Sequence, residues 1–344
     1  MKILYAIQGT GNGHISRARD IIPSLQRYGT VDVLVSGIQA DVNLGFPVKY
    51  KCKGMGFIFG KKGGVDIYQT LKKTDFRNFF KEVMDLPVQN YDMVFNDFEP
   101  VASWACALKH KPSIGLSHQA AVISENAPLP DKSDSFGRFV LKNYAPVSKS
   151  YGFHFERYND STFTPVIRQE IRNLTPENHG HYTVYLPAYD DKRLIQFLSN
   201  FKDTRWEVFS KHNKQSTKID NIKISPVNNS AFMTSLSNCE GFLCGAGFEG
   251  PAEALHLGKK VLAIPMKNQY EQHCNAASLS NLGVPTISSI KPKHISTVND
   301  WIINSNNINV NYPDMTDIIL DNAIEHYYEE HASYSVPKTI LNIF

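Results

Sequence analysis

Two glycine-rich segments, far apart in the chain, have the residue types and spacing that bind phosphate. The first is 9–14 (Gly-Thr-Gly-Asn-Gly-His), directly after the apolar run 3–7, and the second is 244–253, directly after Gly241-Phe242-Leu243. Each pattern predicts a strand, a tight turn and a helix start. Unpaired backbone N–H groups and the helix dipole favour an anion at such a place. The sequence therefore predicts two ligand-binding turns, one on each of two α/β units.

The first turn adds a titratable side chain to this pattern. Gly11, Asn12 and Gly13 are expected to form a loop that receives an acceptor or a phosphate, and His14 falls in the first helical turn. An imidazole there can act as a general base or bind a hydroxyl or phosphate; the alternative is a structural helix-capping histidine. The G-x-G-x-x-G spacing is absent, and no acidic residue ends a second strand about 20 positions on, which disfavours a dinucleotide-binding dehydrogenase.

Polar side chains also follow two later predicted strands. Asp97 and Glu99 come after strand 91–97, and His118 and Gln119 come after strand 113–117. Ligands bind at the carboxyl ends of parallel strands, so these residues should converge with His14. We expect His14, Asp97 and His118 to be catalytic, and Glu99 and Gln119 to line the acceptor or phosphate loop. The alternatives are an N-cap role for Asp97 before Pro100 and an ordinary loop position for His118.

The second turn gives the stronger signal. Gly245, Ala246 and Gly247 allow the backbone to approach a diphosphate at the helix that begins near Gly250-Pro251. Glu253, on the first turns of that helix, can accept both hydroxyls of a ribose, or can simply be favoured there by the helix dipole. Glu271 and Gln272 start a helix after the next strand and can bind the hydroxyls of a sugar.

Composition narrows the class of protein. The chain has 344 residues, 42% hydrophobic and 20% charged, with a formal charge of +3. This length favours two domains, and the small charge excess gives no argument for nucleic-acid binding. The five cysteines form no C-x-x-C pair, so we expect them to be reduced, with no metal site and a cytoplasmic location. No signal peptide or membrane-spanning stretch is expected.

Alternating strand and helix patterns predict an α/β fold of two Rossmann-like, doubly wound domains facing a cleft, residues 1–165 and 166–344. The final helix is expected to pack back on the first domain. The expected strands are 2–7, 31–35, 91–97, 113–117, 151–155, 182–186, 206–209, 222–224, 241–244 and 260–265. The expected helices are 14–27, 68–84, 100–109, 190–201, 229–238, 250–257, 271–282 and 316–332.

The motifs resemble those of MurG-like GT-B glycosyltransferases (glycosyltransferase family 28-like), the group of the peptidoglycan N-acetylglucosaminyltransferase and the diacylglycerol glycosyltransferases. The matching residues are Gly11-Asn12-Gly13-His14, Ser117-His118-Gln119, Gly245-x-Gly247-x5-Glu253, Gly258-Lys259-Lys260, Pro265, Glu271-Gln272 and Asn275-Ala276. The chain departs from the pattern in three places. No glycine turn follows strand 182–186, no glutamate separates His118 from Gln119, and Lys260 replaces the usual proline, so the peptidoglycan reaction itself is not assigned.

The resemblance implies an inverting, metal-independent transferase without a cofactor, which uses a UDP-sugar as co-substrate and a lipid-linked or other cell-envelope acceptor. It implies that Gly245, Ala246, Gly247 and Phe248 hold the diphosphate, Glu253 the ribose, and Glu271 and Gln272 the donor sugar. His14 would be the base or a donor-phosphate contact.

One further segment and two other functions complete these expectations. Segment 54–64 alternates glycine with apolar residues and ends near two lysines; it is either a peripheral contact with the inner face of a membrane or a buried strand and turn. The alternative functions are a non-hydrolysing UDP-N-acetylglucosamine 2-epimerase and a catalytically silent nucleotide-sugar-binding protein.

Overall fold

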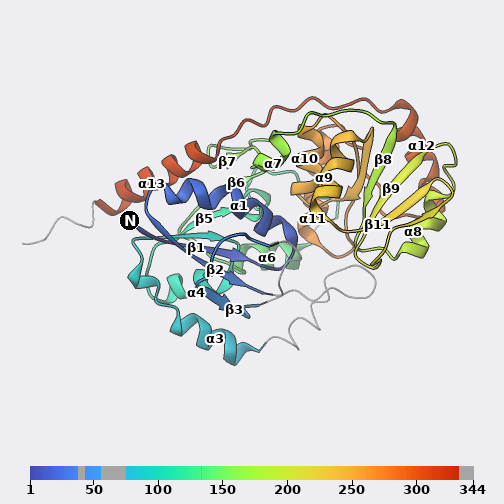
Figure 1. Cartoon of the computed structure of the whole chain (residues 1–344). Coiled ribbons are helices and arrows are strands. Elements are labelled where there is room, and N and C mark those ends of the chain that lie inside the picture. Colours follow the sequence, from blue (N-terminus) through green and yellow to red (C-terminus); the bar gives the residue numbers. More distant parts are fainter. Residues whose placement is uncertain (38–42, 56–74, 133, 333–344) are drawn as a thin grey trace, which may run out of the picture.

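The computed structural model describes residues 1–37, 43–55, 75–132 and 134–332. In these residues, strands and helices alternate along the chain and form two lobes, each a mainly parallel sheet with helices packed on it (Figure 1). This arrangement confirms the predicted α/β class with two Rossmann-like units. The predicted boundary between residues 165 and 166 falls between the last strand of the first sheet and helix α7 (Gln169–Arg172).

The first sheet has the order β3-β2-β1-β4-β5-β6-β7, and every neighbouring pair in it is parallel. The chain therefore reverses its direction of progress across the sheet between β1 and β4, which leaves a crevice at the carboxyl ends of those two strands. The strands are β1 (Lys2–Gln8), β2 (Thr30–Ser36), β3 (Tyr50–Cys52), β4 (Met93–Asp97), β5 (Ile114–Ser117), β6 (Lys149–Phe153) and β7 (Thr162–Phe163).

The second sheet repeats this plan. Its order is β10-β11-β9-β8-β12-β13, parallel except for the β10–β11 pair, and its reversal lies between β8 and β12. The strands are β8 (His181–Tyr185), β9 (Arg205–Ser210), β10 (Thr217–Ile219), β11 (Ile222–Pro226), β12 (Gly241–Gly245) and β13 (Lys260–Ile264).

Helices connect these strands and cover both sheets. The first lobe has α1 (Asn12–Gln26), α3 (Phe76–Asp85), α4 (Pro100–Leu108), α5 (His118–Val122), α6 (Ser135–Asn143) and the 3-10 turn η1 (Val88–Asn90). The rest of the chain has α7, α8 (Asp191–Leu198), α9 (Asn229–Asn238), α10 (Glu249–His256), α11 (Tyr270–Asn281), η2 (Pro292–His294), α12 (Ile295–Asn304) and α13 (Thr316–Ala332).

Side chains along β1 point alternately to the two faces of the first sheet, and a hydrophobic cluster covers each face. Ile3, Tyr5 and Ile7 lie on one face of the sheet and pack in the cluster that includes residues of α1 and α13. Leu4 and Ala6 lie on the other face, in the cluster with residues of α3 and α4. Because both faces are covered, β1 reads as a continuous apolar run. That buried strand fixes the position of the turn that follows it.

The final helix packs on the first lobe, as the sequence predicts. After α12 the chain returns from the second lobe, and α13 lies along α1 (Figure 1). Arg27 forms an ion pair with Asp317, and Tyr28 donates a hydrogen bond to Asp321 (2.5 Å). The chain therefore crosses between the lobes twice, once before α7 and once before α13.

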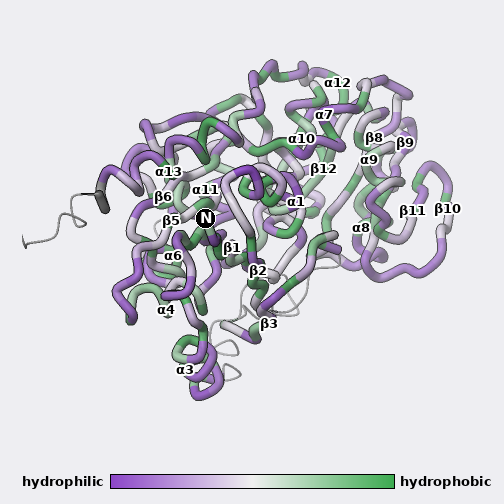
Figure 2. Tube along the Cα trace, turned by 60° about the vertical axis from the view of Figure 1, so that its left-hand side comes forward, coloured by the Kyte–Doolittle hydropathy of each residue, from purple (hydrophilic) through white to green (hydrophobic). Residues whose placement is uncertain are grey.

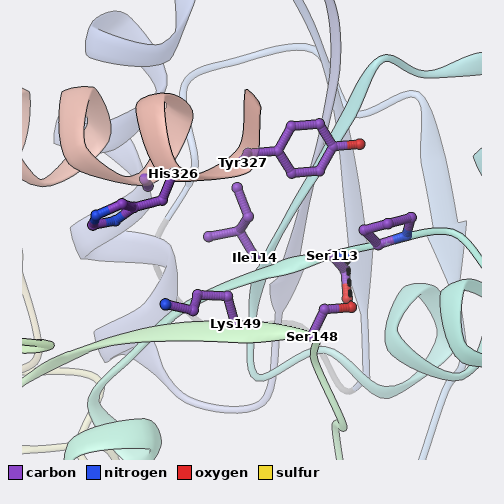
Figure 3. Close-up of a pocket in the computed structure, with 8 residues that line it drawn as sticks. Ser113, Ile114, Ser148, Lys149, His326 and Tyr327 are labelled. Carbon is purple, nitrogen blue, oxygen red and sulfur yellow. Dashed lines mark hydrogen bonds between the residues drawn. The ribbon is translucent and has the colours of Figure 1, made fainter. Parts of the chain in front are cut away.

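A small pocket lies beneath α13, lined among others by Ser113, Lys149 and His326 (Figure 3). Its inner volume of about 10 Å³ has room for at most one water molecule. Ser113 precedes β5 and Lys149 begins β6, so this pocket is at the amino ends of the strands. The first predicted ligand-binding turn lies at the opposite edge of the sheet, at the carboxyl ends of the strands.

Among the described residues, the strands β3, β7 and β10, the helices α5, α6, α7 and α12, and the turns η1 and η2 were not predicted from the sequence. Most of segment 54–64 lies outside the described residues, so its predicted membrane contact is not tested. Among the described helices, none is both long enough and apolar enough to cross a bilayer.

Candidate functional site

The site lies where the crevices of the two sheets meet. The turn after β1 leads into α1, and the turn after β12 leads into α10. A Cβ atom added to Gly13, at the start of α1, would overlap the carboxylate of Glu249, the first residue of α10. The two helix starts therefore touch. The predicted convergence of both glycine turns on one place is observed, although the second lobe itself fills the space beside Gly13.

His14 and Asp97 form a buried pair on the first lobe. His14 Nδ1 is 2.8 Å from Asp97 Oδ1. An ionised carboxylate only accepts hydrogen bonds, so Nδ1 donates and the lone pair of the imidazole is on Nε2. Asp97 is fully buried, whereas His14 keeps some exposure. This geometry leaves Nε2 available as a proton acceptor, and it pairs two of the three residues predicted to be catalytic.

Arg17 completes the charge balance of this pair. It lies one helical turn after His14 and is 1% exposed. Its Nη2 donates to both oxygens of Asp97 at 2.7 and 2.8 Å, and its Nε to Oδ2 at 3.2 Å. Its Nη1 pairs with Glu249 of the second lobe. A buried Asp97 carboxylate is therefore kept ionised by a buried guanidinium.

The pKa shifts follow from these contacts. Burial by itself would lower the pKa of His14, but the charge and hydrogen bond of Asp97 outweigh it, and the pKa lies above its ordinary value. Burial by itself would raise the pKa of Asp97, but Arg17 and His14 hold it below its ordinary value. The pair is thus arranged as a basic imidazole supported by an ionised carboxylate.

Gln119 links this pair to the second lobe. Its Nε2 is 3.5 Å from His14 Nε2 and donates to Glu271 Oε2 at 3.1 Å. Its Oε1 is buried and has no hydrogen-bond partner among the residues that the structure describes. Two predicted residues from different lobes, Gln119 and Glu271, therefore meet beside His14 Nε2, whose contact with the Gln119 amide is a long one at 3.5 Å.

His118 lies deeper than predicted and bridges the lobes. Its Nδ1 is 2.7 Å from the carbonyl oxygen of Phe153, and its Nε2 is 2.7 Å from Asn275 Oδ1. Its ring stacks on Phe248, with centroids 3.9 Å apart and planes 5° apart. Burial lowers its pKa. Both nitrogens are occupied by the protein, so the structure gives His118 a packing and bridging role and not the catalytic position that the sequence predicts.

Glu99 also departs from its prediction. It is fully buried, and its oxygens accept hydrogen bonds from the N–H groups of Val101 (2.8 Å) and Ala102 (2.6 Å). It is therefore the N-cap of α4, which was the alternative considered for Asp97. Phe98, with φ of 55°, turns the chain between them. Glu99 thus faces α4, which contradicts its predicted place in an acceptor or phosphate loop.

The start of α10 is the clearest anion-binding feature. No side chain caps its first amides, which leaves backbone donors available. Within the described part of the chain, a Cβ on Gly247 would meet nothing within 4 Å, and one on Gly245 only atoms at 3.8 Å or beyond; neither residue has a positive φ. The protein's own packing does not require glycine at either position. The N–H of Ala246 donates to Ile264 O (3.0 Å), so a phosphate would contact the amides that follow it.

Glu253 is buried in an ion pair. Arg168, just before α7, donates to Oε1 at 2.5 Å and to Oε2 at 2.9 Å. Burial raises the pKa of Glu253, and Arg168 offsets part of that effect. Its predicted contact with a ribose would therefore have to replace or share the Arg168 bonds. Gln272, another predicted sugar ligand, accepts a hydrogen bond from Met266 N at 2.9 Å.

Sequence reasoning missed Arg17, Arg168 and Glu249. The spacing of Arg17 from His14 is three residues, which places both on one face of a helix, and that signal was available. Arg168 and Glu249 gave none, because their partners come from other elements.

Comparisons with known proteins agree with this geometry. A family model described as glycosyl transferase family 1 matches residues 1–304. No curated protein matches the chain. Among solved structures, MurG of Acinetobacter baumannii is similar with a TM-score of 0.52 and 14% identity, over 96% of this chain and 99% of that one.

Two other solved structures are similar to the same extent. UGT89C1 of Arabidopsis thaliana, complexed with quercetin, has a TM-score of 0.56 and 13% identity, over 97% of this chain and 96% of that one. LpCGTa in complex with UDP has a TM-score of 0.55 and 10% identity, over 95% and 94%. At these identities the likeness shows a shared two-lobed fold.

Proposed function

Because the chain belongs to glycosyl transferase family 1, we propose that it transfers a sugar from a UDP-sugar to a lipid-linked or other cell-envelope acceptor, with inversion and without a metal ion. The family and the GT-B fold confirm the resemblance found in the sequence and the prediction of a glycosyltransferase. They give no support to the epimerase or silent-binding alternatives. The donor, the acceptor and the mechanism are the proposal.

The observation that carries the proposal is the uncapped start of α10 beside Gly245 and Gly247. Open space above two glycines, next to uncapped helix amides, fits a diphosphate, and none of the described residues fills that space. The helix terminus supplies positive potential to the leaving diphosphate, which is the work that a metal ion does in other enzymes. The solved structure of LpCGTa contains UDP, which supports a nucleotide of this kind in the fold.

The remaining donor contacts follow from the position of α10. Glu253 is assigned to the ribose, and Glu271 and Gln272 to the hydroxyls of the donor sugar. Gln119 Oε1, which is buried and unpartnered, adds an acceptor for a substrate hydroxyl.

The pair of His14 and Asp97 supplies the base. The acceptor hydroxyl oxygen forms a bond to the anomeric carbon as its proton passes to His14 Nε2. The bond from that carbon to the diphosphate breaks, and its electron pair leaves with UDP. Asp97 holds the Nδ1 proton and stabilises the imidazolium. In-line attack inverts the configuration at the anomeric carbon.

A lipid-linked acceptor has support on the surface of the first lobe. Helix α3 exposes Phe76, Phe80 and Met84, four residues apart, to 45–61%. Hydrophobic and hydrophilic residues lie side by side along this helix (Figure 2), and Arg77 and Lys81 are among them. Helix α3 also carries Glu82 and Asp85, and Lys81 pairs with Asp85 at 3.9 Å, so it is the exposed apolar side chains, and not a net positive charge, that suit a membrane surface. We propose that the enzyme is cytoplasmic and acts at the inner face of the membrane; the five free cysteines agree with that compartment.

The test is a transfer assay with purified protein, a panel of labelled UDP-sugars, and extracted lipids or envelope glycans, with and without EDTA. We expect an acceptor-dependent product of inverted anomeric configuration that EDTA does not suppress and that His14→Ala abolishes. Absence of UDP binding by calorimetry, or conversion of a UDP-sugar without acceptor, would refute transfer. For the membrane contact, Phe80→Glu should weaken co-sedimentation with anionic vesicles, while Ile303→Glu on α12 should not.

A further inference from the structure

Arg17 joins the catalytic pair to the opposite lobe. Three of its side-chain nitrogens are used: Nε and Nη2 hold Asp97, and Nη1 holds Glu249. Its guanidinium also lies over the ring of Phe153, 5.5 Å from the centroid. A guanidinium is planar and rigid, so the position of Nη1 fixes that of Nη2 and Nε. Glu249, on the second lobe, therefore helps to set how Arg17 holds Asp97.

The charges alternate along this chain of contacts. His14, Asp97, Arg17 and Glu249 follow one another from the first lobe to the second. Without Glu249, the charge of Arg17 would be balanced by Asp97 alone, and Nη2, 3.1 Å from His14 Nδ1, would oppose protonation of the imidazole. With Glu249 in place, Arg17 is shared between two carboxylates. Asp97 is then more able to stabilise a proton on His14.

We propose that Glu249 is a positioning residue of the donor lobe, whose contact with Arg17 across the interface between the lobes makes the His14–Asp97 pair competent as a base. The inference rests on the proposed function of His14 as the base of sugar transfer. Glu249 begins the same helix whose amides are assigned to the diphosphate. The position of α10 that suits the diphosphate therefore also brings Glu249 to Arg17, and so supports His14 as the base.

Gly13 is the steric condition for this contact. Glu249 Oε2 occupies the space that a side chain at position 13 would fill. Any larger residue there would keep the carboxylate away from Arg17. Pairing with Arg17 also neutralises Glu249, which otherwise would place an uncompensated negative charge at the helix start that receives a diphosphate.

The other groups that face His14 do not replace Glu249. Asp97 comes from β4 and Arg17 from α1, Tyr5 on β1 lies next to Asp97, and Glu271 on α11 reaches His14 through Gln119. After the effects of burial and Asp97, Arg17 lowers and Glu249 raises the pKa of His14. The direction agrees with the geometry.

The test uses Glu249→Gln, which keeps the shape and removes the charge, with Asp203→Asn as a control that removes one exposed charge from the same lobe. Histidine side-chain NMR, with and without saturating UDP and assigned with His14→Gln, measures the titration of His14. We expect its pKa to fall by about half a unit or more in Glu249→Gln and not in Asp203→Asn. Gly13→Ala should act in the same direction, because it blocks the contact without changing charge.

Kinetics provide the second readout. Glu249→Gln should lower kcat about tenfold, leave KM for the donor within about threefold, and move the acid limb of the pH profile by the same amount as the NMR shift. An unchanged His14 titration or an unchanged pH profile in Glu249→Gln would overturn the inference, even if transfer is active. A shifted titration in a protein that transfers no sugar would instead overturn the proposed function and leave the electrostatic link standing.

Discussion

The substitution Gly247→Ala tests whether glycine at this position is needed for folding or for ligand binding. No atom of the described residues lies within 4 Å of the added Cβ, and the backbone at this position does not have a positive φ. The folded state therefore accommodates alanine, and the unfolded chain loses some freedom. We expect the free energy of unfolding to stay the same or rise by about 0.4–1 kcal/mol.

Binding of UDP should respond in the opposite way. The new methyl group would stand where we place the diphosphate, and would prevent at least one charged hydrogen bond to the amides of α10. Such a bond contributes about 1.5–3 kcal/mol, and each 1.4 kcal/mol is about a tenfold change in Kd. We expect UDP to bind about 10- to 100-fold more weakly to Gly247→Ala.

Gly250→Ala is the matched control, three residues further along. A Cβ there would lie 3.5 Å from the ring of Phe242, in ordinary contact with the core and away from the crevice. This variant should keep the wild-type affinity for UDP. Calorimetric titration gives Kd, and chemical denaturation gives stability. If Gly247→Ala binds UDP as the wild type does, the diphosphate is not at this turn and the reasoning is wrong.

Three further predictions follow from buried charges. The pKa of His14 lies above the ordinary 6.5, so kcat/KM should decrease as pH falls through that pKa. Asp97→Asn should reduce kcat by about 10²–10⁴-fold and move this acid limb of the pH–rate profile to lower pH. Burial raises the pKa of Glu99 from 4.5 to about 7, so protonated Glu99 contributes stability that is fully present below pH 4.5 and is lost as pH rises through 7. Between pH 5 and pH 8, urea denaturation should therefore show the free energy of unfolding fall by up to about 3 kcal/mol. The decrease should be smaller in Glu99→Gln. Arg168→Met should destabilise the fold by about 3–5 kcal/mol because Glu253 is left buried without its partner, while Arg168→Met with Glu253→Met should recover most of that loss in the same assay.

The sequence predicted those parts of the fold that depend on local pattern. Helices α9 and α13 have the bounds expected from periodicity, and both glycine turns stand where the apolar strands end. The pairing of His14 with Asp97 was foreseeable, because β1 and β4 are neighbours at a reversal of strand order. Helix α6 was not predicted, although its apolar residues recur at helical spacing; none of its residues is buried.

The contacts between lobes could not be predicted from local pattern. From the sequence, Glu249 is an acidic residue at a helix N-terminus after a glycine turn, as the helix dipole favours. Its partner Arg17 is on α1, which comes from the other lobe. Glu99 was misplaced because the positive φ of Phe98 moves the N-cap two residues beyond Asp97. With the φ of Phe98 at 55°, Glu99 caps α4 while Asp97 contacts His14.

The return of α13 to the first lobe constrains how the enzyme can admit its substrates. The polypeptide joins the lobes at two separate places, so the lobes cannot slide freely past each other while the ion pair of Arg27 with Asp317 and the hydrogen bond of Tyr28 to Asp321 persist. We expect any motion of the lobes to be a rotation about the line through both connections, which would widen the crevice on one side and bring Glu249 back to the same position against Arg17.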